Sequence, residues 1–108
     1  MVVRHAVVQK KPKTYIVRTP GVMGGRPRID GHRIRVQDVA HWSKSGMSPD
    51  EIANQFDLTL AEVHAALSFY FDHIEEIRRD VEKDRKFVAT MKKRYPSKLE
   101  AKLKALRG

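Results

Sequence analysis

The sequence contains no cysteine, so neither a disulfide nor a thiolate metal site is available to it. It also contains no apolar run near the roughly 20 residues that a membrane-spanning helix needs. Residues 1–8 include Arg4 and His5 and are too short and too polar for a signal peptide. We therefore expect a cytoplasmic protein that does not bind a membrane.

Patterns of catalytic residues are also scarce. The histidines never pair at the short spacing of metal ligands; they are His5, His32, His41, His64 and His73. No paired carboxylates stand out, and neither does a nucleophile with an adjacent base. We therefore expect neither an enzyme nor a bound metal or cofactor, and we interpret the single histidines as structural.

Charge is abundant and unevenly distributed along the 108 residues, which suffice for one small domain with a modest core. The net charge is +9, from 22 basic and 13 acidic residues. Residues 1–35 hold nine basic and one acidic residue, residues 36–72 hold one and six, and residues 73–108 hold twelve and six. Such a basic protein favours a nucleic-acid partner, and here two basic arms flank an acidic middle.

The N-terminal third combines a basic arm with short strands. Residues 1–14 show no sustained periodicity and are interpreted as a flexible arm, in which Ala6 to Val8 are candidates for a short strand. Tyr15 to Val17 are a second candidate strand. The dipeptide Asp30-Gly31 predicts a tight hairpin turn.

A glycine-rich loop spans Thr19 to Pro27. Its three glycines allow positive φ angles and its two prolines fix their own, so we interpret it chiefly as a rigid turn that joins strands. A phosphate-binding loop is the alternative, although the Gly-Lys-Ser/Thr ending of a P-loop is absent. Four arginines are candidate contacts for DNA phosphates, with solvated charge as the alternative: Arg26, Arg28, Arg33 and Arg35.

Two capping boxes predict the starts of two helices. Ser48-Pro49-Asp50-Glu51 and Thr59-Leu60-Ala61-Glu62 lie eleven residues apart. In each box the hydroxyl oxygen accepts an amide of the first turn, and the Glu accepts the amide of the capping residue. We therefore expect one helix from about Pro49 to Phe56 and another from Leu60. An earlier helix from Val36 to Ser45 is expected to end at Gly46.

The two capped helices have the packing pattern of a helix-turn-helix. Ala53 is the small residue where the helices cross, and Leu58 and Val63 follow five and ten residues later. Asp57 stands in the turn, where it tolerates a left-handed conformation. The inward residues of the second helix are expected to be Leu60, Val63, Ala66, Leu67 and Tyr70.

The outward face of that second helix carries no Lys or Arg. The predicted DNA-contacting residues on this face are Thr59, Ala61, His64 and Ser68. Because much of the affinity for a duplex comes from neutralising phosphates, the cations for the DNA backbone must come from the arms.

The C-terminal third predicts two further helices. Apolar residues recur with a heptad-like step from about His73 to Arg94, interrupted at Asp84, and Pro96 ends that helix. A third capping box, Ser97-Lys98-Leu99-Glu100, is expected to open the next helix. The apolar residues pack on their own domain, form a dimer seam or bind a protein partner. The predicted partner-binding set is Ile77, Val81, Val88, Met91, Leu99, Leu103 and Leu106.

Three stretches of the sequence resemble a known family. Thr19 to Val36, with its glycine loop, is similar to the domain-of-unknown-function family four-three-three, and so are Ser45 to Ala53 and Leu60 to Leu67. The resemblance implies a homeodomain-like helix-turn-helix preceded by short strands, in small bacterial or archaeal proteins often encoded beside a PIN-like ribonuclease toxin. Such members look like antitoxins, and no catalytic residues come with the resemblance.

Together these patterns predict a mainly α fold, with a helix-turn-helix core that the resemblance implies is homeodomain-like, a short N-terminal β-hairpin and a C-terminal helical extension. We expect a basic flexible arm at residues 1–14, short strands plus the helix-turn-helix domain at residues 15–72, and the helical extension at residues 73–108. The expected function is an antitoxin-like regulator that binds double-stranded DNA as a homodimer. The alternative is a protein-interaction module without DNA binding, which neutralises a partner such as a PIN-like ribonuclease toxin.

Overall fold

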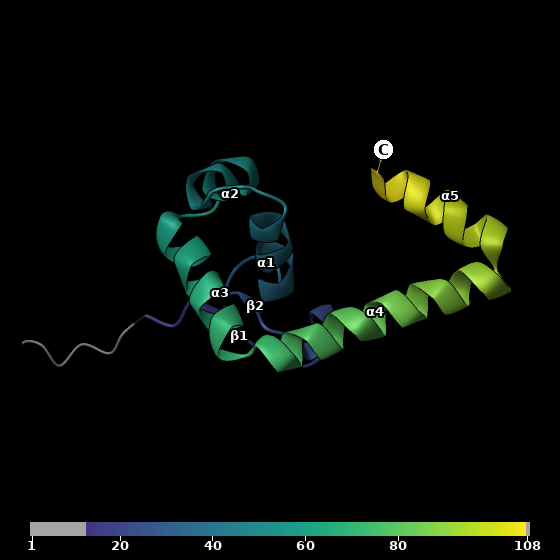
Figure 1. Ribbon diagram of the computed structural model, residues 1–108, viewed down its shortest axis with the longest axis horizontal. Coiled ribbons are helices and arrows are strands. Elements are labelled where there is room, and N and C mark those ends of the chain that lie inside the picture. Colours follow the sequence, from purple (N-terminus) through teal and green to yellow (C-terminus); the bar gives the residue numbers. More distant parts are fainter. Residues whose placement is uncertain (1–12, 108) are drawn as a thin grey trace, which may run out of the picture. The chain divides into compact units, whose positions relative to one another are not determined.

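The computed structural model describes residues 13–107. This part of the chain is mainly helical, with a short two-stranded antiparallel sheet near its start and a helical C-terminal segment, which confirms the predicted fold class (Figure 1). The chain divides into two compact units, one that ends at Phe71 and one that begins at Asp72. The strand expected at Ala6 to Val8 lies outside the described residues.

The sheet of the first unit pairs two strands of two residues each. Strand β1 (Ile16–Val17) runs antiparallel to β2 (Arg28–Ile29), with Ile16 opposite Ile29 and Val17 opposite Arg28. The glycine-rich loop joins them and contains the short 3-10 helix η2 (Met23–Gly25). The predicted role of this loop as a turn between strands is therefore confirmed.

A tight turn follows β2. The backbone N–H of His32 donates to the carbonyl oxygen of Ile29 at 3.0 Å, and Gly31 adopts a φ of 81°. Glycine suits this position because it has no Cβ to oppose a positive φ. The turn predicted at Asp30-Gly31 is confirmed, although the returning chain forms an isolated bridge between Arg28 and Arg35 rather than a further strand.

Three helices complete the first unit: α1 (Val36–Lys44), α2 (Pro49–Phe56) and α3 (Leu60–Asp72). The box at the start of α2 is formed as predicted, since Ser48 Oγ accepts the N–H of Glu51 at 3.1 Å and Glu51 Oε1 accepts the N–H of Ser48 at 2.9 Å. Gly46 ends α1 with a φ of 104°. The boundaries of these helices therefore lie within about one residue of the expected ones.

The core of the first unit joins the sheet to all three helices. Its fully buried side chains are Ile29, Val36, Val39, Ile52 and Val63. Beside them, Trp42 of α1 stacks on Phe56 of α2, with ring centroids 3.6 Å apart and planes at 9°. The prediction that Leu60 points inward is wrong, because this first residue of α3 precedes the crossing with α2 and is 45% exposed.

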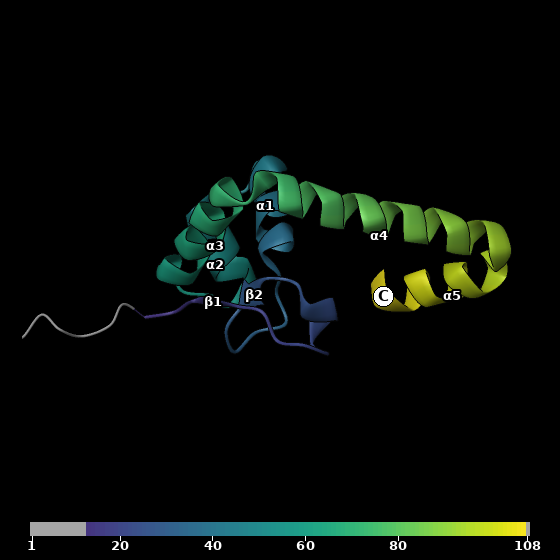
Figure 2. The same ribbon diagram turned by 90° about the horizontal axis from the view of Figure 1, so that it is seen from below.

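The second unit contains α4 (Ile74–Arg94) and α5 (Pro96–Arg107), which contact each other, and α5 turns back along α4 (Figure 2). Pro96 is the first residue of α5, a position that suits proline because no helical partner exists for its missing N–H. The helix therefore begins one residue before the predicted box Ser97-Lys98-Leu99-Glu100. The side chains of residues 96–100 lie outside the description.

Candidate nucleic-acid interface

Helices α2 and α3 are joined by a turn whose backbone has a defined left-handed residue. Asp57 adopts φ 54° and ψ 48°, and the N–H of Leu58 then donates to the carbonyl oxygen of Ala53 at 2.9 Å. Ala53, Leu58 and Val63 are all buried, as the predicted crossing of the two helices requires. Helix α3 thus buries Val63 and Ala66 on one side, while Ala61, His64 and Ser68 on another side are exposed.

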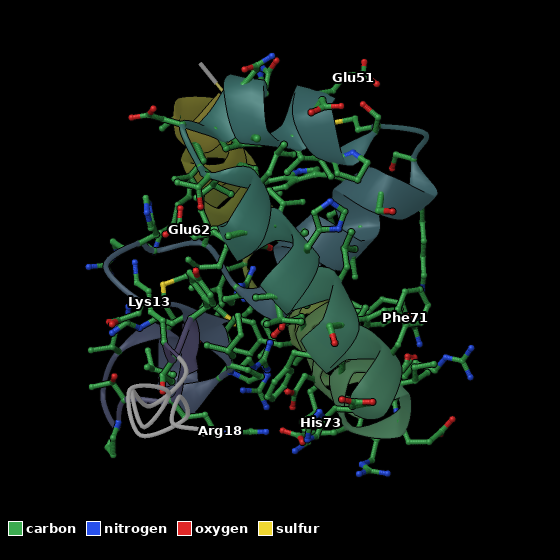
Figure 3. All side chains as sticks on the ribbon, turned by 90° about the vertical axis from the view of Figure 1, so that its left-hand side faces the viewer. Lys13, Arg18, Glu51, Glu62, Phe71 and His73 are labelled. Atoms are coloured by element: carbon green, nitrogen blue, oxygen red, sulfur yellow. The ribbon has the colours of Figure 1, made fainter. Side chains whose placement is uncertain are left out.

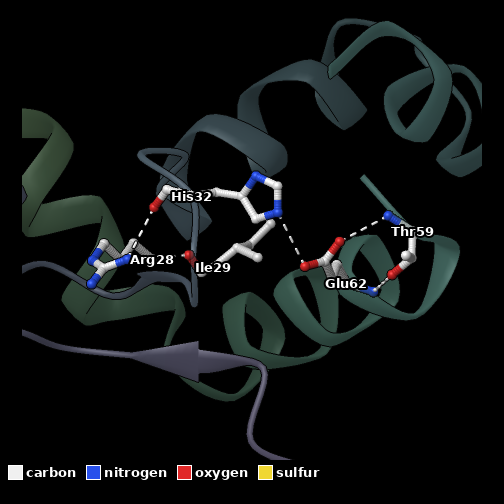
Figure 4. Close-up of polar contacts among 5 residues, drawn as sticks. All are labelled: Arg28, Ile29, His32, Thr59 and Glu62. Atoms are coloured by element: carbon white, nitrogen blue, oxygen red, sulfur yellow. Dashed lines mark hydrogen bonds and ion pairs between the residues drawn. The ribbon is translucent and has the colours of Figure 1, made fainter. Parts of the chain in front are cut away.

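The first turn of α3 is held by the predicted capping box and by a contact that sequence reasoning missed. Glu62 Oε1 accepts the N–H of Thr59 at 2.9 Å, and Thr59 Oγ1 accepts the N–H of Glu62 at 3.1 Å. The second carboxylate oxygen of Glu62 lies 3.3 Å from His32 Nε2, in the turn after β2 (Figure 4). One carboxylate therefore ties the strand region to the start of α3.

The pKa of Glu62 is lowered below its usual range. The largest cause is the backbone N–H of Thr59, with further contributions from the Thr59 hydroxyl, His32 and Lys13, while burial of the carboxyl acts in the opposite direction. At neutral pH the Glu62 carboxylate is therefore ionised, and its oxygens are engaged by Thr59 and His32. Its oxygens face Thr59 and His32 rather than the open side of the helix.

The open face of α3 is uncharged over two turns. Ala61, His64, Ala65 and Ser68 follow the spacing i, i+3, i+4 and i+7, which places them on one side of the helix. The predicted DNA-contacting residues are all exposed, namely Thr59, Ala61, His64 and Ser68. The same side continues to Phe71, whose side chain is 66% exposed at the end of the first unit (Figure 3).

Arg28, predicted as a phosphate contact, is turned into the fold. Its guanidinium donates to the carbonyl oxygen of His32 at 3.0 Å, with a longer contact of 3.4 Å to the carbonyl of Ile29 (Figure 4). It also donates to Thr19 Oγ1 at 3.1 Å. These contacts hold the glycine-rich loop and the tight turn together. Arg28 therefore serves the structure of the strand region rather than an open surface.

Arg35 and Arg26 also have partners within the first unit. Asp38 accepts both the backbone N–H of Arg35, at 2.9 Å, and its guanidinium, at 3.0 and 3.2 Å, which anchors the start of α1. Arg26 donates to the side chain of Gln37 at 3.1 Å. Of the four predicted arginines, Arg33 is exposed, whereas the other three are half-buried.

Further cations surround this unit, and several lie over aromatic rings. Lys13 lies 5.2 Å from the ring centre of Tyr15, and Arg18 lies 5.5 Å from that of Phe69. Both cations are exposed, and Figure 3 labels them on the strand side of α3. Sequence reasoning missed both ring contacts. The contact between Arg18 and Phe69 joins residues that are far apart in the chain and so leaves no local pattern.

The predicted partner-binding residues of α4 and α5 differ in accessibility. Val81, Val88 and Leu106 are exposed, and Met91 and Leu103 are half-buried. Ile77 is buried within the chain, and the side chain of Leu99 lies outside the described residues.

Two aromatic residues that the sequence prediction omitted are also open, since Phe87 is 64% and Tyr95 is 48% exposed. Helix α4 therefore carries more exposed apolar surface than the heptad-like pattern indicated.

Within residues 13–107, no group of three His, Asp or Glu side chains lies close enough together to hold a metal ion. None of the helices in that part of the chain combines the length and apolarity needed to cross a membrane.

Comparison with known proteins places this geometry in context. The model of a family described as a protein of unknown function, DUF433, matches residues 16–70. A crystal structure of a DUF433 member protein from Anabaena variabilis ATCC 29413 is 29% identical in sequence, with a TM-score of 0.60, and the match covers 71% of this chain and 73% of that chain. No curated protein matches the sequence.

Proposed function

The chain belongs to the DUF433 family of proteins of unknown function, and we propose that it is an antitoxin-like regulator that binds double-stranded DNA through α3. The observation that carries the proposal is the arrangement of α2, the left-handed turn at Asp57 and α3. The antitoxin part rests on the family resemblance, since such members are often encoded beside a PIN-like ribonuclease toxin.

The packing of α2 on α3 supports a helix-turn-helix. In that motif the first helix crosses the DNA backbone and the second enters the major groove with its N-terminal residues near the base edges. Here the buried trio of Ala53, Leu58 and Val63 fixes the crossing. The N-terminal part of α3 is left open, which is the part that a groove-binding helix uses.

The chemistry of the open α3 face also supports the proposal. Ala61 and Ala65 are short enough to allow close approach and present methyl groups, which suit the methyl group of thymine. His64, Ser68 and Thr59 supply hydrogen-bonding groups for base edges or phosphates. The carboxylate of Glu62, which would repel phosphate, is occupied by Thr59 and His32.

Phosphate contacts have to come from cations beside α3 rather than on it. Lys13, Arg18 and Arg33 are exposed on the first unit, and the chain as a whole carries a net charge of +9. A protein that neutralises phosphates releases counterions from the DNA, so its affinity falls as the salt concentration rises. Arg28 and Arg35 are assigned to the structure and not to DNA.

The proposal is tested by measuring binding of the full chain to a duplex taken from the region upstream of its own coding sequence. Fluorescence anisotropy at low and at moderate salt should give an affinity that falls steeply with salt. An unrelated duplex of the same length serves as the control for sequence preference. Affinity that does not change between the two salt concentrations, or no binding at either, would contradict the proposal.

A second candidate function is a protein-interaction module that neutralises a partner such as a PIN-like ribonuclease. The observation that favours it is the exposure of Leu106 on α5, whose side chain is 77% accessible. Leu106→Glu is expected to abolish co-purification with the product of the neighbouring gene, whereas Ala105→Glu adds the same charge at an exposed neighbouring position and should not. Equal loss in both variants, or in neither, would count against α5 as the binding element.

A further inference from the structure

An apolar stripe on α4 remains open to solvent. Residues at alternating steps of three and four form one side of the helix: Ile74, Ile77, Val81, Asp84, Val88, Met91 and Tyr95. Ile77 is buried within the chain, but Val81 is 47% and Val88 is 36% exposed even with α5 in place. Phe87 lies beside the stripe and is more exposed than either valine. The open part of the stripe therefore runs from Val81 to Tyr95.

The charges of α4 reverse along its length. Residues 74–84 contain five acidic and three basic side chains, whereas residues 85–94 contain five basic side chains and no acidic one. The apolar stripe crosses this reversal, so one end of the open surface is acidic and the other is basic. A helix that pairs with this surface is best complemented when its own charges run the opposite way.

From this pattern we infer that α4 pairs in antiparallel orientation with α4 of a second copy of the chain. An antiparallel copy sets the acidic half of each helix beside the basic half of the other, whereas a parallel copy sets like charges side by side. A parallel pair would also place the two Asp84 carboxylates directly opposite each other, where like charges repel, whereas an antiparallel pair separates them. This interface does not depend on DNA binding by the first unit.

The heptad positions fix a register for the antiparallel pair. Val81 lies opposite Met91 of the other copy, and Asp84 lies opposite Val88, which keeps the two Asp84 carboxylates apart. The twofold axis then passes near Phe87, so the two exposed Phe87 rings meet beside the seam. On the same side, Asp80 comes next to Arg94 of the other copy.

On the other side of the seam, Arg85 meets Arg85 of the other copy. Each of these guanidinium groups is already paired on its own helix, since Arg85 Nη2 lies 2.7 Å from Glu82 Oε1. Glu82 therefore offsets the repulsion that the two arginines would otherwise exert across the axis.

The proposed pairing through the apolar stripe of α4 is tested by measuring the oligomeric state of the chain. Sedimentation equilibrium of the full chain is expected to show a reversible dimer at micromolar concentrations. Phe87→Glu and Val88→Glu should each weaken it by roughly tenfold or more, because Val88→Glu puts a carboxylate into the seam and Phe87→Glu brings two carboxylates together beside it at the twofold axis. Ala89→Glu adds the same charge at an exposed position away from the stripe and should leave the dimer intact.

Disulfide cross-linking tests the orientation, and the absence of cysteine from the sequence makes single-cysteine variants unambiguous. Phe87→Cys is expected to cross-link with itself, whereas Asp80→Cys and Arg94→Cys should cross-link with each other when mixed and not with themselves. In the antiparallel register each of the latter two lies about 21 Å along the helix from its own counterpart, which is too far for a disulfide.

The opposite results would overturn the inference. A wild-type chain that stays monomeric at high micromolar concentration would show that α4 does not pair with a second copy. A dimer that survives both Phe87→Glu and Val88→Glu would place the interface elsewhere. Self-cross-linking of Asp80→Cys would indicate a parallel pair.

Discussion

His32 Nε2 lies 3.3 Å from Glu62 Oε2, while the other oxygen of the same carboxylate accepts the N–H of Thr59 at 2.9 Å. Glu62 is thus shared between the turn after β2 and the first turn of α3. Because α3 is the helix proposed to enter DNA, this carboxylate positions the start of that helix relative to the strand region.

Glu62→Gln is expected to lower the stability of the protein at neutral pH, because the ionised carboxylate makes the stronger contacts with Thr59 and His32. The pKa of Glu62 is lowered in the folded chain, chiefly by the Thr59 N–H. A lowered carboxyl pKa contributes stability above its ordinary value near 4.5, and this contribution is lost as the pH falls through the folded value. Urea unfolding of both proteins should therefore show a gap at pH 7 that narrows below pH 4.5; a gap of constant size over that range would contradict this role.

Thr59→Ala is expected to destabilise the chain by about 1 kcal/mol, since it removes the oxygen that accepts the Glu62 N–H at the start of α3. Thr59→Ser keeps that oxygen and is the matched control, with most of the stability retained. The measurement is the free energy of unfolding in urea. Equal losses in the two variants would show that the hydroxyl does not cap α3.

Substitutions of Arg33 and Arg35 are expected to have different effects, the first on DNA affinity and the second on the stability of the fold. Arg33→Gln should leave the unfolding midpoint unchanged and reduce the slope of log affinity against log salt by about 1, as for the loss of one phosphate contact. Arg35→Gln should instead cost about 0.5 to 1 kcal/mol of stability, because the partly exposed pair with Asp38 is lost. Thermal unfolding together with DNA titration checks both variants, and the reverse pattern would refute the assignment.

The sequence carries the information for most of the elements of the first unit because the signals are local. Ser48 with Glu51 and Thr59 with Glu62 mark the starts of α2 and α3, since a capping box needs only residues three apart. Gly31 and Gly46 mark turns because few other residues accept a positive φ. Local chemistry of this kind is visible without any knowledge of the tertiary structure.

The roles of the arginines were not visible in the same way. Arg28 donates to Thr19 and to the carbonyl of His32, and these partners meet it only after the glycine-rich loop has folded back. Asp38, by contrast, stands three residues after Arg35 in the first turn of α1, and that spacing is a signal that careful reading of the sequence can use. The alternation of side chains along a predicted strand did not show that Arg33 is exposed while Arg28 and Arg35 bind partners within the fold.

The exposed apolar residues of the second unit show a related limit of prediction from sequence. A heptad-like pattern identifies which side of α4 is apolar, but not which part of that side the chain covers itself. Ile77 and Val81 follow the same pattern, yet the first is buried and the second is open. Burial is a property of the folded chain, so the pattern alone did not distinguish them.

The central claim, that the open face of α3 contacts DNA, is tested most directly by adding a carboxylate to that face. Ser68→Glu places it on the exposed side of α3, and Ala89→Glu adds the same charge at an exposed position on α4, outside the proposed DNA-binding helices. The account predicts that duplex affinity, measured by fluorescence anisotropy with unchanged thermal stability, falls by roughly tenfold or more for Ser68→Glu and much less for Ala89→Glu. Wild-type affinity in the Ser68→Glu variant would contradict the claim.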